Sequence, residues 1–508
     1  MGVFTPTCTS ASNEPFARSE SYYNMHRTSL FQSVFRTSDA RVSLLGVLLM
    51  AILLSLAGGL LVALLGGPIS LGLVVGIVFG VWMLRDIDVG YVALIAVVCL
   101  LPFGALPVNI GFKPTFLDVI ILPMFLVWLL RRVTGKQGQL VTVPVGVPIL
   151  AFMALAVASF IAGLGHAPLT QTIARHFAEV LLSIALFFMI VDTVRDEARL
   201  IKFVRAIMIA GFLASIVAIV LYVLPGRTTM ELLSRLRVFG YPEGPGVLRY
   251  ILDDPSLTQR ATGTSVDPNV LGGLLILTLV LSVAQVFGAR PVVSRGWAML
   301  IAATMGVALV LTFSRGSFFG AGVALAGLGV LRYRKILPVI LAVVVVILVL
   351  PQTQGYVTHF FEGVRGEDLA TQMRAGEYQD AFTLIGRYPI FGVGFTGSPD
   401  LDTYIGVSSV YLLMAEEMGL VGLGVFLLVM LTLFGWSWQA RRTVSASPAL
   451  ETMWWGLHAA LAGALIGGIL DHYFFNLDFH HSVIFFWLYV GLAASVTRLA
   501  GKTTTNSG

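Results

Sequence analysis

The sequence contains little charge and no long polar domain. Only 12% of its 508 residues are charged, whereas 57% are hydrophobic, and its mean hydropathy is +0.89. A soluble domain carries roughly a quarter charged residues and cannot bury this much apolar surface in one core. The composition therefore excludes an ordinary soluble protein and indicates an integral membrane protein.

The sequence also lacks paired cysteines, a signal peptide and a basic surface pattern, and each absence excludes a class of protein. Cys8 and Cys99 lie in a polar tail and in an apolar run, which excludes a disulfide framework. The first forty residues have no short apolar core before a cleavage site, so we interpret them as a cytoplasmic tail and not as a signal peptide. The net charge of +5 comes from short clusters between apolar runs, a pattern of membrane topology and not of nucleic acid binding. We expect no cofactor.

Long apolar runs fill most of the chain. A membrane-spanning helix needs roughly 17–25 apolar residues. Fourteen candidate runs lie near 44–66, 68–84, 89–108, 115–130, 143–163, 177–191, 203–224, 268–288, 296–313, 316–331, 336–350, 407–438, 453–470 and 482–498. The sequence therefore predicts an all-α polytopic membrane protein with about 14 transmembrane helices. The run 407–438 is long for one span, so we expect it to begin outside the bilayer.

Basic residues fix the predicted orientation. With the N-terminus in the cytoplasm, the cytoplasmic connections hold sixteen Lys or Arg residues and the short outer connections only three, Lys113, Arg175 and Arg315. Because positive charge is retained inside, both termini are predicted to be cytoplasmic. The predicted parts are a tail (1–43), N-terminal helices (44–224), a first outer loop (225–267), central helices (268–350), a second outer loop (351–406), C-terminal helices (407–499) and a tail (500–508).

The two outer loops are too long to be simple connectors, and we expect them to carry short helices. In the first, Asp267 and Pro268 form an ordinary N-cap and first turn before the next apolar run. Helix formation does not explain Arg260 or Asn269, and Asn269 should lie in the first turn of that helix, at the membrane edge. In the second loop, the spacing predicts a short amphipathic helix over 374–386, which is either a lid on the bilayer or the carrier of a catalytic Arg374.

Charged residues also occur beside apolar runs. A guanidinium such as Arg315 is costly there unless it is paired or lines a wet cavity, and its rigid donors suit a diphosphate. The alternative is that Arg315 snorkels to lipid headgroups. Glu416 and Glu417 lie near the start of the twelfth run, where the helix dipole explains them in part. Adjacent helix positions point about 100° apart, and we expect Glu417 to face inward.

The last outer connection runs from Asp471 to His481. Its adjacent histidines, His480 and His481, are poorly spaced for two ligands on one helix, so we predict no metal site. Its aromatic residues suit an interfacial belt, and Asp471 or His472 is a candidate base.

Four blocks together resemble the O-antigen ligase and polymerase superfamily of bacterial membrane glycosyltransferases. Arg260 to Asn269 is similar to an R-x-x-G…PN block, and Leu311 to Gly316 is similar to an L-T-x-S-R-G turn. Arg374 to Gly394 resembles an arginine helix followed by a P-x-x-G-x-G loop, and Tyr411 to Gly419 resembles a YLxxxxExG motif. The likeness covers roughly residues 200–500 in the same order and spacing.

The resemblance implies a metal-independent, inverting glycosyltransferase at the outer face of the bacterial inner membrane. The donor would be a polyprenyl diphosphate-linked oligosaccharide and the acceptor a glycan or lipid, with other polysaccharide assembly proteins as candidate partners. Arginines would neutralise the leaving diphosphate, and a base would take the acceptor proton. The resemblance and the residue patterns together predict four catalytic residues, Arg260, Arg315, Arg374 and Glu417. They also predict the substrate-binding residues Asp267, Asn269, Ser408, Ser409, Tyr411, Asp471 and His472.

The sequence departs from this pattern at one place. Ser408 and Ser409 stand where the family's ligases have a His-Asn pair, and a neutral serine cannot act as an imidazole base. Candidate replacements are Glu417, Asp402, Asp471 and His472. The departure favours a polysaccharide polymerase over a ligase. A lipid-linked glycan or polysaccharide transporter or flippase, and a non-catalytic subunit of an export complex, remain as alternatives.

Overall fold

The computed structural model describes residues 66–109, 111–135, 138–349, 369–397 and 406–505, with position 365 and scattered positions between 52 and 63. The predicted tail 1–43, Asp402 and most of the second outer loop lie outside these residues. The chain divides into two compact units, Met1–Phe79 and Gly80–Gly508. Apart from the first part of α3 (Gly67–Arg85), the features below belong to the second unit.

Helices make up nearly all of the described secondary structure. Within the described ranges, seven helices are long and apolar enough to cross a membrane. They are α6 (Gly146–Gly163), α7 (Gln171–Thr193), α8 (Glu197–Val223), α10 (Pro268–Phe287), α11 (Arg295–Thr312), α16 (Val410–Gln439) and α19 (His480–Thr505). The other helices of four residues or more that the site and packing involve are α3 (Gly67–Arg85), α4 (Asp88–Leu100), α5 (Phe116–Val133), α12 (Arg315–Leu331), α13 (Ile336–Val349), α15 (Leu369–Arg387), α17 (Arg441–Val444) and α18 (Pro448–Gly467).

Every apolar run predicted from residue 68 onward overlaps a helix, but the run 89–108 is only partly helical, because α4 ends at Leu100. The prediction of a polytopic all-α membrane protein agrees with the structure. The count of fourteen spans stays a prediction, because several of these helices are shorter than a bilayer crossing requires.

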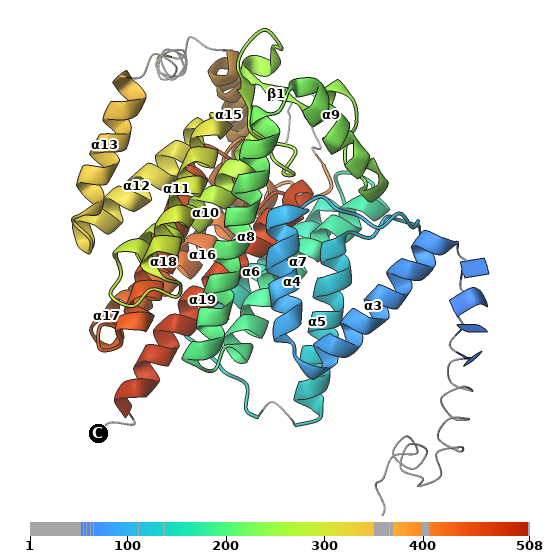
Figure 1. The fold of residues 1–508 in the computed structure, drawn as a ribbon, viewed down its shortest axis with the longest axis horizontal. Helices are drawn as coiled ribbons and strands as arrows, with labels where there is room; N and C mark the ends of the chain where they lie inside the picture. Colours follow the sequence, from blue (N-terminus) through green and yellow to red (C-terminus); the bar gives the residue numbers. More distant parts are fainter. Residues whose placement is uncertain are drawn as a thin grey trace, which may run out of the picture. The chain divides into compact units, whose positions relative to one another are not determined.

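Two helices form the centre of the bundle. In their most apolar stretches, 94% of the residues of α19 and 83% of the residues of α10 are buried. α10 packs against α11, α12 and α18, and α19 packs against α7 and α18 (Figure 1). The contact between α12 and α18 is very close. A Cβ added to Gly320 would lie 2.6 Å from the Gly463 carbonyl oxygen, so glycine is required for this approach.

The segment 225–267 is folded into short elements. It contains α9 (Gly226–Ser234), three 3-10 turns (Arg235–Phe239, Pro245–Val247 and Ile251–Asp253) and two strands, β1 (Arg249–Tyr250) and β2 (Gln259–Arg260). The strands pair antiparallel, with Arg249 opposite Arg260. Short helices were expected here, whereas the hairpin was not, because two-residue strands leave no periodic pattern in the sequence.

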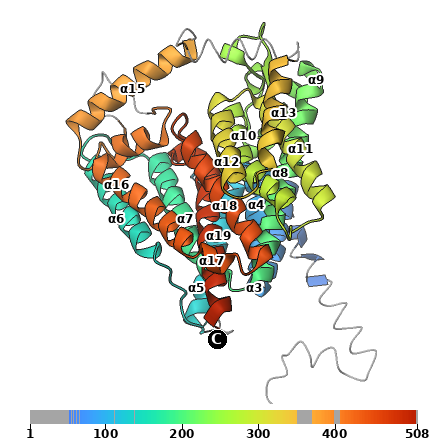
Figure 2. The ribbon, with the colours of Figure 1, turned by 90° about the vertical axis from the view of Figure 1, so that its left-hand side faces the viewer.

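α15 is longer than the predicted helix 374–386. It begins at Leu369 and ends at Arg387, just before Pro389 prevents its continuation. Figures 1 and 2 show α15 at the same end of the bundle as β1 and α9, and it packs against α16. This arrangement brings residues from distant parts of the sequence to one end of the helices.

α16 is broken near its start, which agrees with the expectation that 407–438 is more than one straight span. Gly419 has φ 69° and ψ 179°, so the helix changes direction there. The loop after α15 fills the break. Leu420 donates its backbone N–H to the carbonyl of Pro389 (2.8 Å), and Val393 and Gly394 donate theirs to the carbonyls of Glu416 (2.7 Å) and Glu417 (3.0 Å).

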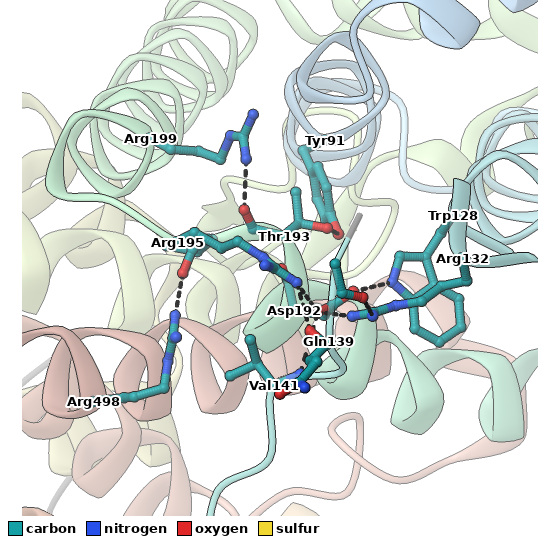
Figure 3. Close-up of polar contacts among 12 residues, drawn as sticks. Tyr91, Trp128, Arg132, Gln139, Val141, Asp192, Thr193, Arg195, Arg199 and Arg498 are labelled. Atoms are coloured by element: carbon teal, nitrogen blue, oxygen red, sulfur yellow. Dashed lines mark hydrogen bonds and ion pairs between the residues drawn. The ribbon is translucent and has the colours of Figure 1, made fainter. Parts of the chain in front are cut away.

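A charged network joins the C-terminal ends of α5 and α7 to the last turns of α19 (Figure 3). Asp192 of α7 is fully buried and pairs with Arg132 at the end of α5. It also accepts hydrogen bonds from Arg195 (2.9 Å) and from the indole of Trp128 (2.8 Å). Arg498 of α19 donates to the carbonyl of Val194, which joins the last helix to the same network. Its arginines, Arg132, Arg195 and Arg498, are among the basic residues predicted to lie on the cytoplasmic side, and that orientation stays a prediction.

Candidate functional site

The arginine cavity, a space of about 170 Å³, lies between the β1–β2 segment, the α11–α12 turn and α15. Its walls contain three guanidinium groups and one carboxylate, which leaves two net positive charges. Sites for drug-sized molecules occupy about 300–1,000 Å³. The arginine cavity is therefore the size of a head group and not of a whole glycan. Its lining residues are Tyr250, Ile251, Leu252, Asp253, Arg260, Asn269, Phe313, Arg315 and Arg374.

Arg260 is held rigidly by its neighbours. Its Nε donates to the carbonyl of Thr312 (2.9 Å), and its Nη2 donates to Oδ1 of Asn269 (2.9 Å). Burial lowers the pKa of its guanidinium, although Asp267 nearby opposes this effect. An arginine remains protonated in any such environment. Arg260 therefore presents a fixed, partly desolvated positive charge to the cavity.

Asn269 is placed by the start of α10. The carboxylate of Asp267 accepts hydrogen bonds from the backbone N–H groups of Asn269 (2.7 Å) and Val270 (3.2 Å), so Asp267 is the predicted N-cap. Arg249 lies 3.5 Å from the other oxygen of Asp267. Asp267 thus supports Asn269 from behind and is not among the lining residues.

Arg315 is the first residue of α12, immediately after a strained turn. Phe313 has φ 52°, an uncommon left-handed conformation for a bulky residue, and it caps the end of α11. This turn directs Arg315, which is half-buried, to the cavity at a helix N-terminus. The backbone dipole of α12 adds partial positive charge at that point, which favours an anion.

Arg374 comes from α15, and a carboxylate follows it one turn later. Arg374 and Glu377 are three positions apart and so share one side of the helix. Oε2 of Glu377 accepts hydrogen bonds from Oγ (2.7 Å) and from the backbone N–H (3.0 Å) of Ser408. The hydroxyl of Tyr378 donates to the carbonyls of Ser408 (3.5 Å) and Ile469 (3.4 Å). α15 is thereby tied to the start of α16 and to the end of α18.

Asp471 follows α18 and lies beside the arginines. Its carbonyl accepts a hydrogen bond from Val410 (3.0 Å), and its Oδ1 accepts one from the backbone N–H of His472 (3.0 Å). Burial raises the pKa of the Asp471 carboxyl to about 7, although Arg374 and Arg260 lower it. Burial also lowers the pKa of His472, which favours the neutral imidazole. Asp471 is therefore a carboxyl that changes its charge near neutral pH.

The chemistry of this arrangement is that of an anion site beside a proton acceptor. Three arginines from three segments converge on one small cavity. Asp471, whose carboxyl has a pKa of about 7, is not among the lining residues, but it interacts electrostatically with Arg374 and Arg260. Such a site can stabilise charge that grows on a phosphate leaving group. It can also accept a proton from a nucleophile.

The O-antigen ligase family model matches residues 300–427 of the chain. Over this segment the match confirms the resemblance to the O-antigen ligase and polymerase superfamily. Comparison with curated proteins gives no match. The family implies a glycosyltransferase-like membrane enzyme with lipid-linked oligosaccharide and glycan substrates.

The O-antigen ligase segment supplies only part of the cavity. Arg315 and Arg374 lie inside the matched residues, whereas Arg260 and Asn269 precede them and Asp471 follows them. The predicted residues Arg260, Asn269, Arg315 and Arg374 therefore meet at one place. Their catalytic and binding roles stay proposals.

Other predicted residues of the O-antigen ligase segment have structural contacts. Glu417 is buried but does not line the arginine cavity, and its carbonyl accepts a hydrogen bond from Ser159 (2.6 Å). Ser409 is the N-cap residue of α16, and Tyr411 donates its hydroxyl to the carbonyl of Leu465 (2.8 Å). These three residues shape the broken helix.

Glu377 is the residue that the sequence analysis missed. Its position three residues after Arg374 on a predicted helix was available as a signal, because that spacing places both on one side. Its partner Ser408 lies 31 positions further along the chain, so their contact could not be predicted from spacing.

Proposed function

We propose that this chain is a glycosyltransferase of the O-antigen polymerase or ligase type. It transfers or polymerises polyprenyl diphosphate-linked oligosaccharide at the outer face of the bacterial inner membrane, in the biosynthesis of a surface or exported polysaccharide. The observation that carries the proposal is the convergence of Arg260, Arg315 and Arg374 on one cavity of about 170 Å³. Its two net positive charges complement the two negative charges of a diphosphate diester.

The proposed reaction is a single displacement with inversion. The acceptor hydroxyl attacks the anomeric carbon, the bond from that carbon to the diphosphate oxygen breaks, and polyprenyl diphosphate leaves. The three arginines stabilise the negative charge that develops on the leaving oxygen, so this chemistry requires no metal. Asn269 fixes Arg260 for this role through their 2.9 Å hydrogen bond.

We assign the base to Asp471. Its carboxyl interacts with both Arg374 and Arg260, and its pKa of about 7 suits proton transfer at neutral pH. Ser408 stands at the position of the ligase histidine in the resemblance, and it is hydrogen-bonded to Glu377. We assign Glu377 the role of positioning the start of α16. The loss of that histidine supports a polymerase over a ligase.

The decisive experiment uses the purified chain and a polyprenyl diphosphate-linked oligosaccharide. We expect a ladder of extended products with lipid-linked acceptor alone. A single shifted band that appears only with a different lipid acceptor would instead indicate a ligase. No product under either condition would contradict the enzyme and favour a carrier or a non-catalytic subunit.

Two variants and a control connect this test to the cavity. Arg315→Ala and Arg374→Ala should each lower the rate by about 100-fold or more, as expected when one donor to the developing charge is removed. Arg227 is an exposed arginine in the segment 225–267, which also carries Arg260, and its partner Glu231 lies 3.2 Å away. Arg227→Ala should retain the full rate, and equal losses in all three variants would contradict the cavity assignment.

A further inference from the structure

A second polar cluster lies away from the arginine cavity, where three helices meet. It contains Asp118 near the start of α5, Glu179 of α7 and His480 at the start of α19. All three residues are buried, and one donor atom from each lies within 4.8 Å of the others. None of them has a role in the proposed glycosyl transfer.

The charge of this cluster is not balanced by its nearest cation. Nε of Arg175 lies 2.6 Å from Oε1 of Glu179, and its Nη2 lies 3.7 Å from Oδ2 of Asp118. When both carboxyl groups are ionised, the single guanidinium leaves one net negative charge, which either a proton held between the carboxyls or a further cation can balance. A buried charge without a partner is costly. A further cation would remove that cost.

His480 is an independent sign of a ligand. Its side chain is only 8% exposed, and neither ring nitrogen has a hydrogen-bond partner among the described residues. Buried polar groups in proteins nearly always have one. Nδ1 lies 3.5 Å from Oε2 of Glu179, so the imidazole faces the carboxylates. A lone pair directed at two carboxylates suits a shared metal ion.

Other contacts orient the two carboxylates as a metal site requires. Arg175 contacts Oε1 of Glu179, while Oε2 faces His480 and is available for a metal. Oδ2 of Asp118 accepts a hydrogen bond from the backbone N–H of Thr115 (2.8 Å), which fixes that side chain in a capping box. Metal ligands are usually held in this way by outer partners.

We propose that Asp118, Glu179 and His480 bind a divalent transition-metal ion, with Zn²⁺ as the best match. Zn²⁺ accepts both imidazole nitrogen and carboxylate oxygen, and catalytic-type sites use three protein ligands, which this cluster supplies; the imidazole disfavours Mg²⁺ and Ca²⁺. The ion joins α5, α7 and α19. Because α19 follows directly on the connection that carries Asp471, it also stabilises the segment beside the arginine cavity. The proposal does not depend on the proposed glycosyl transfer.

The test measures metal content in the purified, tag-free chain. After treatment with a chelator, the protein is dialysed against ZnCl₂, MnCl₂ or MgCl₂, and bound metal is counted by mass spectrometry. We expect one Zn²⁺ per chain and a higher melting temperature. Glu179→Gln and His480→Gln should each weaken Zn²⁺ binding by at least about 10–100-fold. The matched control is His458→Gln, since His458 is another buried histidine, whose Nδ1 contacts the carbonyl of Trp454 (2.8 Å).

A spectroscopic variant covers the case in which the ligand substitutions unfold the protein. His480→Cys retains a metal ligand, so its Co²⁺ form should show a thiolate-to-metal charge-transfer band that the parent chain lacks. The absence of that band would overturn the proposal. So would the absence of stoichiometric Zn²⁺ in the parent chain, or Zn²⁺ binding that is equal in Glu179→Gln, His480→Gln and His458→Gln.

Discussion

At the scale of single residues, the ionisation of Asp471 decides the proposed reaction. Its pKa is raised to about 7 by burial, so the carboxylate that can accept a proton forms only as the pH rises through that value. We expect the initial rate of glycosyl transfer to fall about tenfold per pH unit below 7 and to be level above it. A pH–rate profile from pH 5 to 9 measures this.

The Asp471→Asn variant is the control for that profile. It should lose nearly all activity. Asp471→Glu should retain measurable activity, and its rate should still fall toward acid pH (the acid limb of the profile). A raised pKa in the folded state also stabilises the fold at low pH, and this contribution is lost as the pH rises through about 7. The melting temperature of Asp471→Asn should therefore lack that dependence on pH. A normal acid limb in Asp471→Asn would show that another group is the base.

Glu377 provides a second prediction at this scale. Its carboxylate accepts two hydrogen bonds from Ser408. Glu377→Gln retains the size of the side chain but weakens these bonds, so we expect the rate to fall roughly tenfold, about the value of one hydrogen bond to a charged group. The acid limb of the pH profile should stay in place. If Glu377→Gln instead abolishes activity and removes that limb, Glu377 and not Asp471 is the proton acceptor.

At the scale of elements, the break in α16 depends on one glycine. Gly419 has φ 69°, and a Cβ added there would lie 2.1 Å from the carbonyl oxygen of Ile390. Gly419→Ala should therefore lower the stability by at least about 1–2 kcal/mol and separate the α15–α16 loop from the helix. Thermal unfolding in detergent measures the loss. Gly424→Ala, in the same helix with no atom within 4 Å of the added carbon, should leave the melting temperature unchanged or higher.

The helices could be predicted from the sequence more completely than the site. Long apolar runs specify helices locally, and Asp267 and Pro268 show where α10 begins. The arginines of the cavity could be selected as candidates because charge beside hydrocarbon needs a reason. Their convergence could not be predicted, since it depends on the φ of 52° at Phe313 and on β1–β2 pairing. The contacts of Glu377 and of His480 join residues far apart in the sequence, and spacing does not report such contacts.

At the scale of the whole molecule, the Asp192 network holds together helices from both halves of the chain. Asp192 is the carboxylate paired with both Arg132 and Arg195, and no part of its side chain is exposed. Asp192→Ala removes the carboxylate from both guanidinium groups, which should lower the free energy of unfolding by about 3–5 kcal/mol. We expect a large decrease in melting temperature, while Glu197→Ala, at an exposed position on α8, should have little effect. An unchanged melting temperature in Asp192→Ala would mean that the network adds no stability.

The orientation of the molecule determines which substrates can reach the arginine cavity. The excess of basic residues predicts that the Asp192 end faces the cytoplasm, so the cavity opens to the outside. Exposed Thr228 and Ala446 lie on the two predicted sides. In a Cys8→Ser background, a maleimide that does not cross membranes should label Thr228→Cys in intact cells, and Ala446→Cys only after lysis. The opposite pattern would place the three arginines in the cytoplasm, where a donor would not need to cross the membrane before reaction. The labelling therefore tests the topology and the proposed site of polymerisation together.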